Sequence, residues 1–80
     1  MSETLDKKFT GRGPIFVKLE GMERRVGVTI APGDPLSNAV RQAASMLIPR
    51  FVAGNLNDQF EIVEDNTSTT GYLVIRKKGG

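Results

Sequence analysis

The chain has 80 residues, 39% of them hydrophobic, and its 11 basic and 9 acidic side chains give a net charge of +2. This length makes one small domain, and so mild a charge does not identify a polyanionic partner. There is no cysteine and no histidine, which removes thiol nucleophiles, imidazole bases and the usual zinc sites. We therefore expect no catalytic residue, no metal site and no enzyme.

The N-terminal sequence indicates the compartment and the start of the domain. No apolar run approaches the roughly 20 residues of a membrane span, and MSETLDKK lacks a signal-peptide core. We expect a cytoplasmic protein without a membrane partner. Residues 1–13 are polar apart from Leu5 and Phe9, and they end in a glycine-rich run before Pro14. They predict a flexible arm before a domain at residues 14–76, which a flexible tail at residues 77–80 follows.

Residues 15–30 predict a β-hairpin. In IFVKLE, every second residue from Ile15 to Leu19 is aliphatic, so these side chains share one face of a strand. Gly21 allows a turn, after which RRVGVTI resumes the alternation. The residues expected to face the core are Ile15, Val17, Leu19, Val26, Val28 and Ile30.

A helix is predicted after this hairpin. Asp34 is expected as its N-cap, and Pro35 fits the first helical position. Apolar residues then recur every three or four positions from Leu36 to Leu47, which predicts an amphipathic helix packed on a sheet. Pro49 should end it, because a proline ring clashes with the carbonyl one turn back.

The remaining sequence predicts a loop and a second hairpin. Phe51 and Val52 are expected to pack beneath the helix exit, and Gly54-Asn55 to start the loop. FEIVED and GYLVIRKK read as strands joined by the polar NTSTTG, in which Gly71 can supply a positive φ. Two hairpins bury one helix only if they form a single sheet, with the first and last strands parallel in the middle. We predict an α+β fold of order ββαββ with one helix on a mixed four-stranded sheet.

Four runs, IFVK, VTIAPGD, PLSNAV and above all LVIRKKGG, resemble ubiquitin and its relatives at matching places along the chain. The resemblance covers the first hairpin, the helix start, and the last strand with its tail, and it implies the β-grasp fold. The short link between FEIVED and the last strand leaves no room for the extra strand and helical turn of ubiquitin. The chain is thus similar to a minimal, bacterial type of ubiquitin-like protein, near in size to the prokaryotic sulfur carriers.

The resemblance implies chemistry at the C-terminal Gly79 and Gly80. In that family an activating enzyme uses ATP and magnesium to adenylate the terminal carboxylate, which passes through a thioester to an isopeptide bond with a target amine. Residues without a Cβ suit a tail that enters a narrow, water-poor site. Arg76, Lys77 and Lys78 would guide the tail into the activating enzyme. Lys77 departs from the family, because ubiquitin has an apolar residue there.

The implied partners are an activating enzyme, a conjugating enzyme, a deconjugating protease and target proteins, and the chain itself holds no cofactor. A sulfur carrier with a Gly80 thiocarboxylate is the alternative that needs the same tail. The run KKGG can also be read as a solvated strand end. A nucleic-acid partner is disfavoured, because three adjacent cations stand without a second basic patch or a set of stacking aromatic residues.

A third alternative is a noncovalent interaction module. Alternation places Phe16, Val63, Tyr72 and Val74 on the side of the sheet away from the helix, and an apolar patch there is typical of a partner-binding face. The opposing interpretation is that the arm folds over this patch through Leu5 or Phe9.

Overall fold

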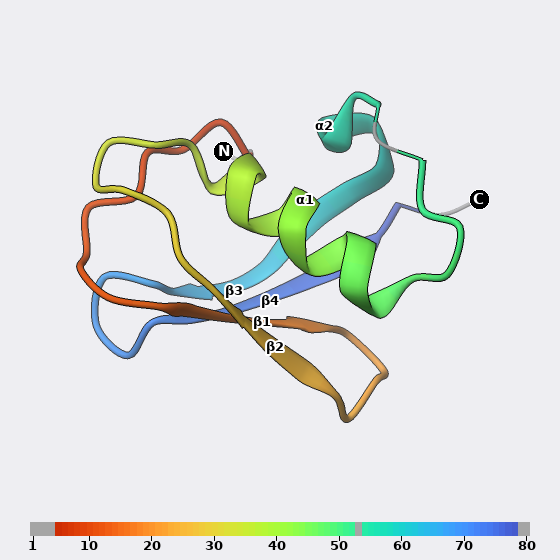
Figure 1. Ribbon diagram of the computed structural model, residues 1–80, viewed down its shortest axis with the longest axis horizontal. Helices are drawn as coiled ribbons and strands as arrows, with labels where there is room; N and C mark the ends of the chain where they lie inside the picture. The colour runs from red at the N-terminus through yellow and green to blue at the C-terminus, as the bar shows by residue number, and fades with distance from the viewer. Residues whose placement is uncertain (1–4, 53, 79–80) are drawn as a thin grey trace.

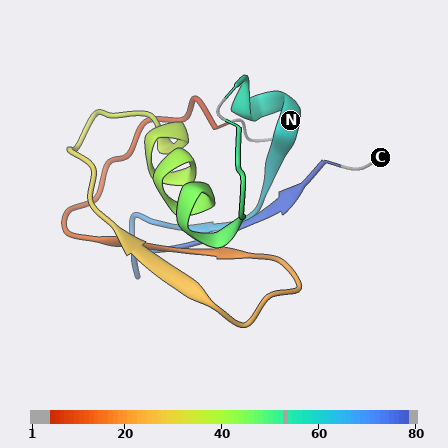
Figure 2. The same ribbon diagram turned by 45° about the vertical axis from the view of Figure 1, so that its right-hand side comes forward.

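The computed structural model of the protein describes residues 5–52 and 54–78. One twisted sheet carries a helix across one face (Figures 1 and 2). The elements in chain order are β1 (Ile15–Leu19), β2 (Arg25–Val28), α1 (Leu36–Leu47), α2 (Leu56–Gln59), β3 (Phe60–Asn66) and β4 (Tyr72–Lys77). The strand order is β2-β1-β4-β3, in which β1 and β4 are parallel and the outer pairs antiparallel. The predicted arrangement of one helix on a mixed four-stranded sheet is confirmed.

The core lies between α1 and the sheet, where the two apolar patterns meet. Ile15 and Val17 on β1 are fully buried, as are Leu36 and Val40 on α1. Every residue predicted to face the core from the first hairpin is buried. The alternation of the hairpin and the periodicity of α1 were therefore read correctly.

The N-terminal segment is part of this core, which differs from the predicted arm. Leu5 and Phe9 are each only 1% exposed and belong to the same apolar cluster as α1. The N–H of Phe9 donates to the Asp34 carbonyl, and the N–H of Gly33 donates to the Phe9 carbonyl, both at 2.8 Å. Figure 1 shows this red segment beside the first turn of α1. We call residues 5–10 the N-terminal strap, and with it the domain begins well before residue 14. Residues 1–4 lie outside the described part.

The strap also caps α1, which corrects the predicted N-cap. Pro35 is the capping residue and makes no side-chain hydrogen bond. The Asp34 carboxylate instead accepts from the N–H of Ala31 at 3.2 Å. The first N–H groups of a helix need partners from outside the helix. Those of Leu36 and Ser37 donate to the strap carbonyls of Lys7 and Leu5, at 2.9 and 2.8 Å.

The segment that follows α1 is partly as predicted. The helix ends at Leu47, before Pro49. Phe51 is half-buried, with its ring centroid 6.1 Å from that of Phe60, but the expectation for Val52 is wrong, since it is 77% exposed. The chain then forms α2, a single turn that was not predicted. The side chain of Asn55 caps this turn by accepting from the N–H of Asn57 at 3.0 Å.

A β-bulge interrupts the pairing of β3 with β4. Ile62 pairs with Ile75, but the next pair joins Glu64 to Val74, so Val63 is the extra residue. An extra residue reverses which face the following side chains take. Asp65 consequently pairs with Leu73 and shares the face on which α1 and the strap lie.

Candidate functional site

The side of the sheet away from α1, here called the open face, carries an aromatic pair. Phe16 on β1 pairs in register with Tyr72 on β4. The Phe16 side chain is 42% exposed, and the guanidinium carbon of Arg25 lies 5.9 Å from its ring centroid. With Thr70, these three residues line a hollow of about 300 Å³. Two aromatic rings and one cation thus line the hollow, an arrangement suited to binding a flat or apolar group of a partner.

Gly27 leaves room for this arrangement. It pairs with Phe16 across the first hairpin, and a Cβ at this position would lie 3.2 Å from the Phe16 ring. The missing side chain of Gly27 thus leaves space that the Phe16 ring borders.

The four residues predicted for the partner-binding face differ in their exposure. Val63 is 42% exposed at the bulge, and Tyr72 is half-buried. Val74 is only 8% exposed, although it lies outside the core cluster. Its neighbours in register are Lys18 and Glu64, long side chains whose aliphatic parts can cover a valine. Val74 therefore supports the open face from below and offers little surface for contact.

The strap does not cover the open face. Leu5 and Phe9 are buried on the helix side of the sheet, so the interpretation in which the arm folds over Phe16 is wrong. Phe16 therefore remains 42% exposed among the described residues.

The three cations predicted to guide the tail are separated by the structure. The Arg76 Nε donates to a Glu61 carboxylate oxygen at 2.7 Å, and its Nη1 lies 3.8 Å from Glu20. The hydrogen bond that Arg76 donates to Glu61, together with the negative charge of Glu61, raises the pKa of Arg76. Lys77 and Lys78 are exposed and make no ion pair within residues 5–52 and 54–78. Arg76 is thus held over the sheet, whereas the two lysines face solvent.

The end of β4 lies one residue beyond the predicted domain boundary. The strand includes Lys77, and the N–H of Lys78 donates to the Gln59 carbonyl at 2.8 Å. The tail is therefore ordered by backbone bonds up to Lys78. The predicted conjugation residues Gly79 and Gly80 lie outside the described residues.

A second hollow beside this strand end was not predicted. It measures about 340 Å³, and Arg50 from the α1 exit joins Lys77 and Lys78 in its wall. The sequence does not indicate a second basic patch, because Arg50 stands alone among neutral residues. Only the return of the chain past the end of β4 brings these three cations to one hollow.

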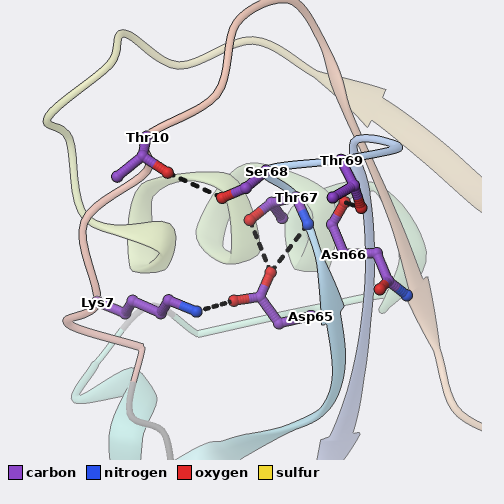
Figure 3. A network of polar contacts seen from close by, with 7 residues as sticks. All are labelled: Lys7, Thr10, Asp65, Asn66, Thr67, Ser68 and Thr69. Carbon is purple, nitrogen blue, oxygen red and sulfur yellow. Dashed lines mark hydrogen bonds and ion pairs between the residues drawn. The ribbon is translucent and has the colours of Figure 1, made fainter.

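A polar cluster fastens the strap to the loop after β3 (Figure 3). The Lys7 Nζ lies 2.6 Å from the Asp65 carboxylate, which also accepts from the hydroxyl and N–H of Thr67 at 2.6 and 3.0 Å. Burial by itself would raise the pKa of Asp65, but the hydrogen bonds from Lys7 and Thr67 and the charge of Lys7 together hold it below its usual value. Thr10 and Ser68 share a further hydrogen bond of 2.8 Å.

The described ranges contain neither a cluster of metal ligands nor a membrane-spanning helix. No three carboxylate, imidazole or thiol side chains there lie close enough together to hold a metal ion. Neither helix in those ranges has the length and apolar character needed to cross a membrane.

No family model, no curated protein and no solved structure matches the chain. Its function is therefore argued from the fold and the geometry of its surfaces.

Proposed function

We propose that the protein has the ubiquitin-like β-grasp fold and acts as a protein modifier. In this proposal the Gly80 carboxyl group, present at the end of the chain or released by processing, is adenylated by an activating enzyme with ATP and magnesium. The acyl group then passes to a cysteine of a conjugating enzyme and on to an amine of a target protein. The protein is the substrate and carrier in these reactions.

The observation that carries the proposal is the parallel pairing of β1 and β4 at the centre of the sheet, with α1 across one face. This is the topology that the ββαββ reading of the sequence required. The pairing holds β4 between two strands, and backbone bonds to the neighbouring chain continue to Lys78, the residue before Gly79. A rigid strand followed directly by glycines can deliver a carboxyl group into a partner's site.

A noncovalent interaction module is the second candidate function, and the open face favours it. Phe16 remains 42% exposed beside Arg25, and the strap is used elsewhere. Exposed aromatic and arginine side chains are common at the centres of protein interfaces. The same face also suits the modifier, since a modifier must bind its activating and conjugating enzymes.

The decisive test is to express the chain with an N-terminal tag in its cell of origin and to purify it under denaturing conditions. We expect covalent adducts whose tryptic peptides join Gly80 to a lysine. Deleting Gly79 and Gly80 should abolish these adducts and leave the circular dichroism spectrum unchanged. The change Gly79→Ala should reduce them, because a Cβ obstructs a narrow site.

Each other outcome identifies a different function. A mass gain at Gly80 that corresponds to replacement of oxygen by sulfur would identify a sulfur carrier. Proteins that copurify only under native conditions, and are lost with Phe16→Ala, would identify the noncovalent module. Adducts that persist after deletion of Gly79 and Gly80 would contradict the proposal.

A further inference from the structure

Three cations from two distant segments surround the hollow beside the end of β4. Arg50 follows α1, and Lys77 and Lys78 end the last strand. Apolar walls are supplied by Ile48, Phe51, Val52 and Phe60. We call this surface, lined by Ile48, Arg50, Phe51, Val52, Asp58, Gln59, Phe60, Lys77 and Lys78, the basic hollow. It lies on the helix side of the sheet, because Lys77 pairs with the buried Phe60.

Among the described residues, anions balance only part of the positive charge of the basic hollow. Within the described chain neither Arg50, Lys77 nor Lys78 makes an ion pair, whereas Arg76 is paired with Glu61. Asp58 is the carboxylate in the wall, so the cations exceed the anions by two. Such a surface attracts acidic groups and orients them as they approach.

The apolar part of the hollow is exposed where a partner could reach it. Val52 is 77% exposed, and the Gln59 side-chain amide donates to its carbonyl at 3.4 Å. Phe51 lies half-buried beside it, with its ring against Phe60. The hollow therefore offers an apolar contact in the same wall as its cations.

Arg50 has a backbone conformation that a side chain disfavours. Its φ is +58°, in the left-handed region that glycine adopts without strain after a helix. A residue with a Cβ is strained in this region, because the Cβ comes close to the following carbonyl oxygen. An arginine at this position supplies a guanidinium to the hollow where glycine would suit the backbone better.

We propose that the basic hollow binds an acidic segment of a partner protein, with one apolar side chain of that segment placed against Phe51 and Val52. Nucleic acid fits these observations less well. Phe60 is buried and Phe51 is half-buried against it, so the hollow lacks the set of exposed aromatic rings on which successive bases stack. The binding requires no reaction at Gly80, so it goes beyond the modifier function.

Peptide selection tests this proposal. A library of random peptides displayed on phage is selected on the full chain, and the enriched peptides are measured by fluorescence anisotropy. We expect peptides in which Asp and Glu flank a large apolar residue, with affinity that falls as salt rises. Amide shifts in NMR spectra should map to the described residues of the basic hollow.

Matched variants separate this site from general charge attraction. The change Arg50→Gly removes the guanidinium, so it should lower affinity by about tenfold. The protein should remain folded, because glycine suits the positive φ of this position. Lys77→Glu should act similarly. Arg24→Glu, at an exposed site in the β1–β2 turn, should change affinity little. Deleting Gly79 and Gly80 should leave binding unchanged, which distinguishes this site from the reactive tail.

Four outcomes would overturn the proposal: no enrichment of acidic peptides, equal binding by Arg50→Gly, an equal loss with Arg24→Glu, or loss of binding on removal of Gly79 and Gly80. Tighter binding of single-stranded RNA than of any selected peptide, lost with Arg50→Gly, would assign the hollow to nucleic acid instead.

Discussion

The ammonium group of Lys7 lies 2.6 Å from the carboxylate of Asp65, although 58 residues separate them in the chain. Lys7 belongs to the strap, and Asp65 lies on β3 after the bulge. The Asp65 side chain is 4% exposed, against 43% for Lys7. One carboxylate thus joins the strap that caps α1 to the edge of the sheet.

Asp65 should make the stability of the protein fall in acid. Its pKa in the folded protein is below the ordinary value of 3.8, so the folded state binds a proton less readily than the unfolded state. The stabilisation by the Asp65 carboxylate is complete above pH 3.8 and is lost as the pH falls through the lowered pKa. We expect Asp65→Asn to reduce the free energy of unfolding by about 1–3 kcal/mol near neutral pH. Urea titrations at several pH values should show this difference shrinking in acid.

The control for Asp65 is Glu23→Gln, at an exposed site without an ion pair in the described residues. It should change stability little at any pH. If the difference in free energy of unfolding between wild type and Asp65→Asn stays constant as the pH falls, the charge of Asp65 does not contribute to stability.

The strap should be essential to the fold. Phe9 is 1% exposed within the core, and Phe9→Ala should cost about 3–5 kcal/mol, a large share of the total for so small a domain. Thermal unfolding followed by circular dichroism measures this cost. Thr10→Ala, which removes only an exposed hydrogen bond, is the control. A protein that begins at residue 14 and remains fully folded would show that the strap is dispensable.

Gly71 should tolerate alanine worse than other glycines with positive φ. Its φ is +70°, and a Cβ there would lie 2.8 Å from the Pro14 carbonyl oxygen. Gly21 has a similar φ of +89° but no atom within 4 Å of such a Cβ. Gly21→Ala should therefore cost about 1–2 kcal/mol from the backbone alone, and Gly71→Ala distinctly more. Equal losses in urea denaturation would mean that the Pro14 carbonyl moves aside.

On the open face the smaller side chain should matter more for stability. Val74→Ala removes two buried methyl groups, worth about 1.5–2.5 kcal/mol with the cavity. Phe16→Ala should cost about 1 kcal/mol because the ring is 42% exposed. Met46→Ala, at a 49% exposed site on α1, is a control for loss of exposed apolar surface. A loss of about 3–5 kcal/mol with Phe16→Ala would show that Phe16 belongs to the core.

The sequence was most informative where one local pattern extends over many residues. Alternation in the first hairpin and periodicity in α1 placed the core residues correctly, because their faces follow directly from backbone geometry. Gly71 was recognised as the turn residue for a similar reason, since a positive φ favours glycine. The topology followed from the need to bury α1 on one sheet.

Features made by distant contacts could not be read in this way. Leu5 and Phe9 stand alone in a polar segment, so no period reveals that they fill the end of the core. The bulge at Val63 changes the face of Asp65 without any glycine or proline to mark it. Arg50 becomes part of a basic surface only through the return of the chain to the end of β4.

The parallel pairing of β1 with β4 has a consequence for how the chain acquires its structure. β1 cannot complete its pairing until β4 is available. Pairings between distant segments form slowly, because a long loop has to close first. During synthesis the β1–β2 hairpin and α1 would leave the ribosome with their apolar faces uncovered. Folding can then finish only after β4 has emerged, so most nascent chains shorter than residue 77 should be targets for chaperones and proteases.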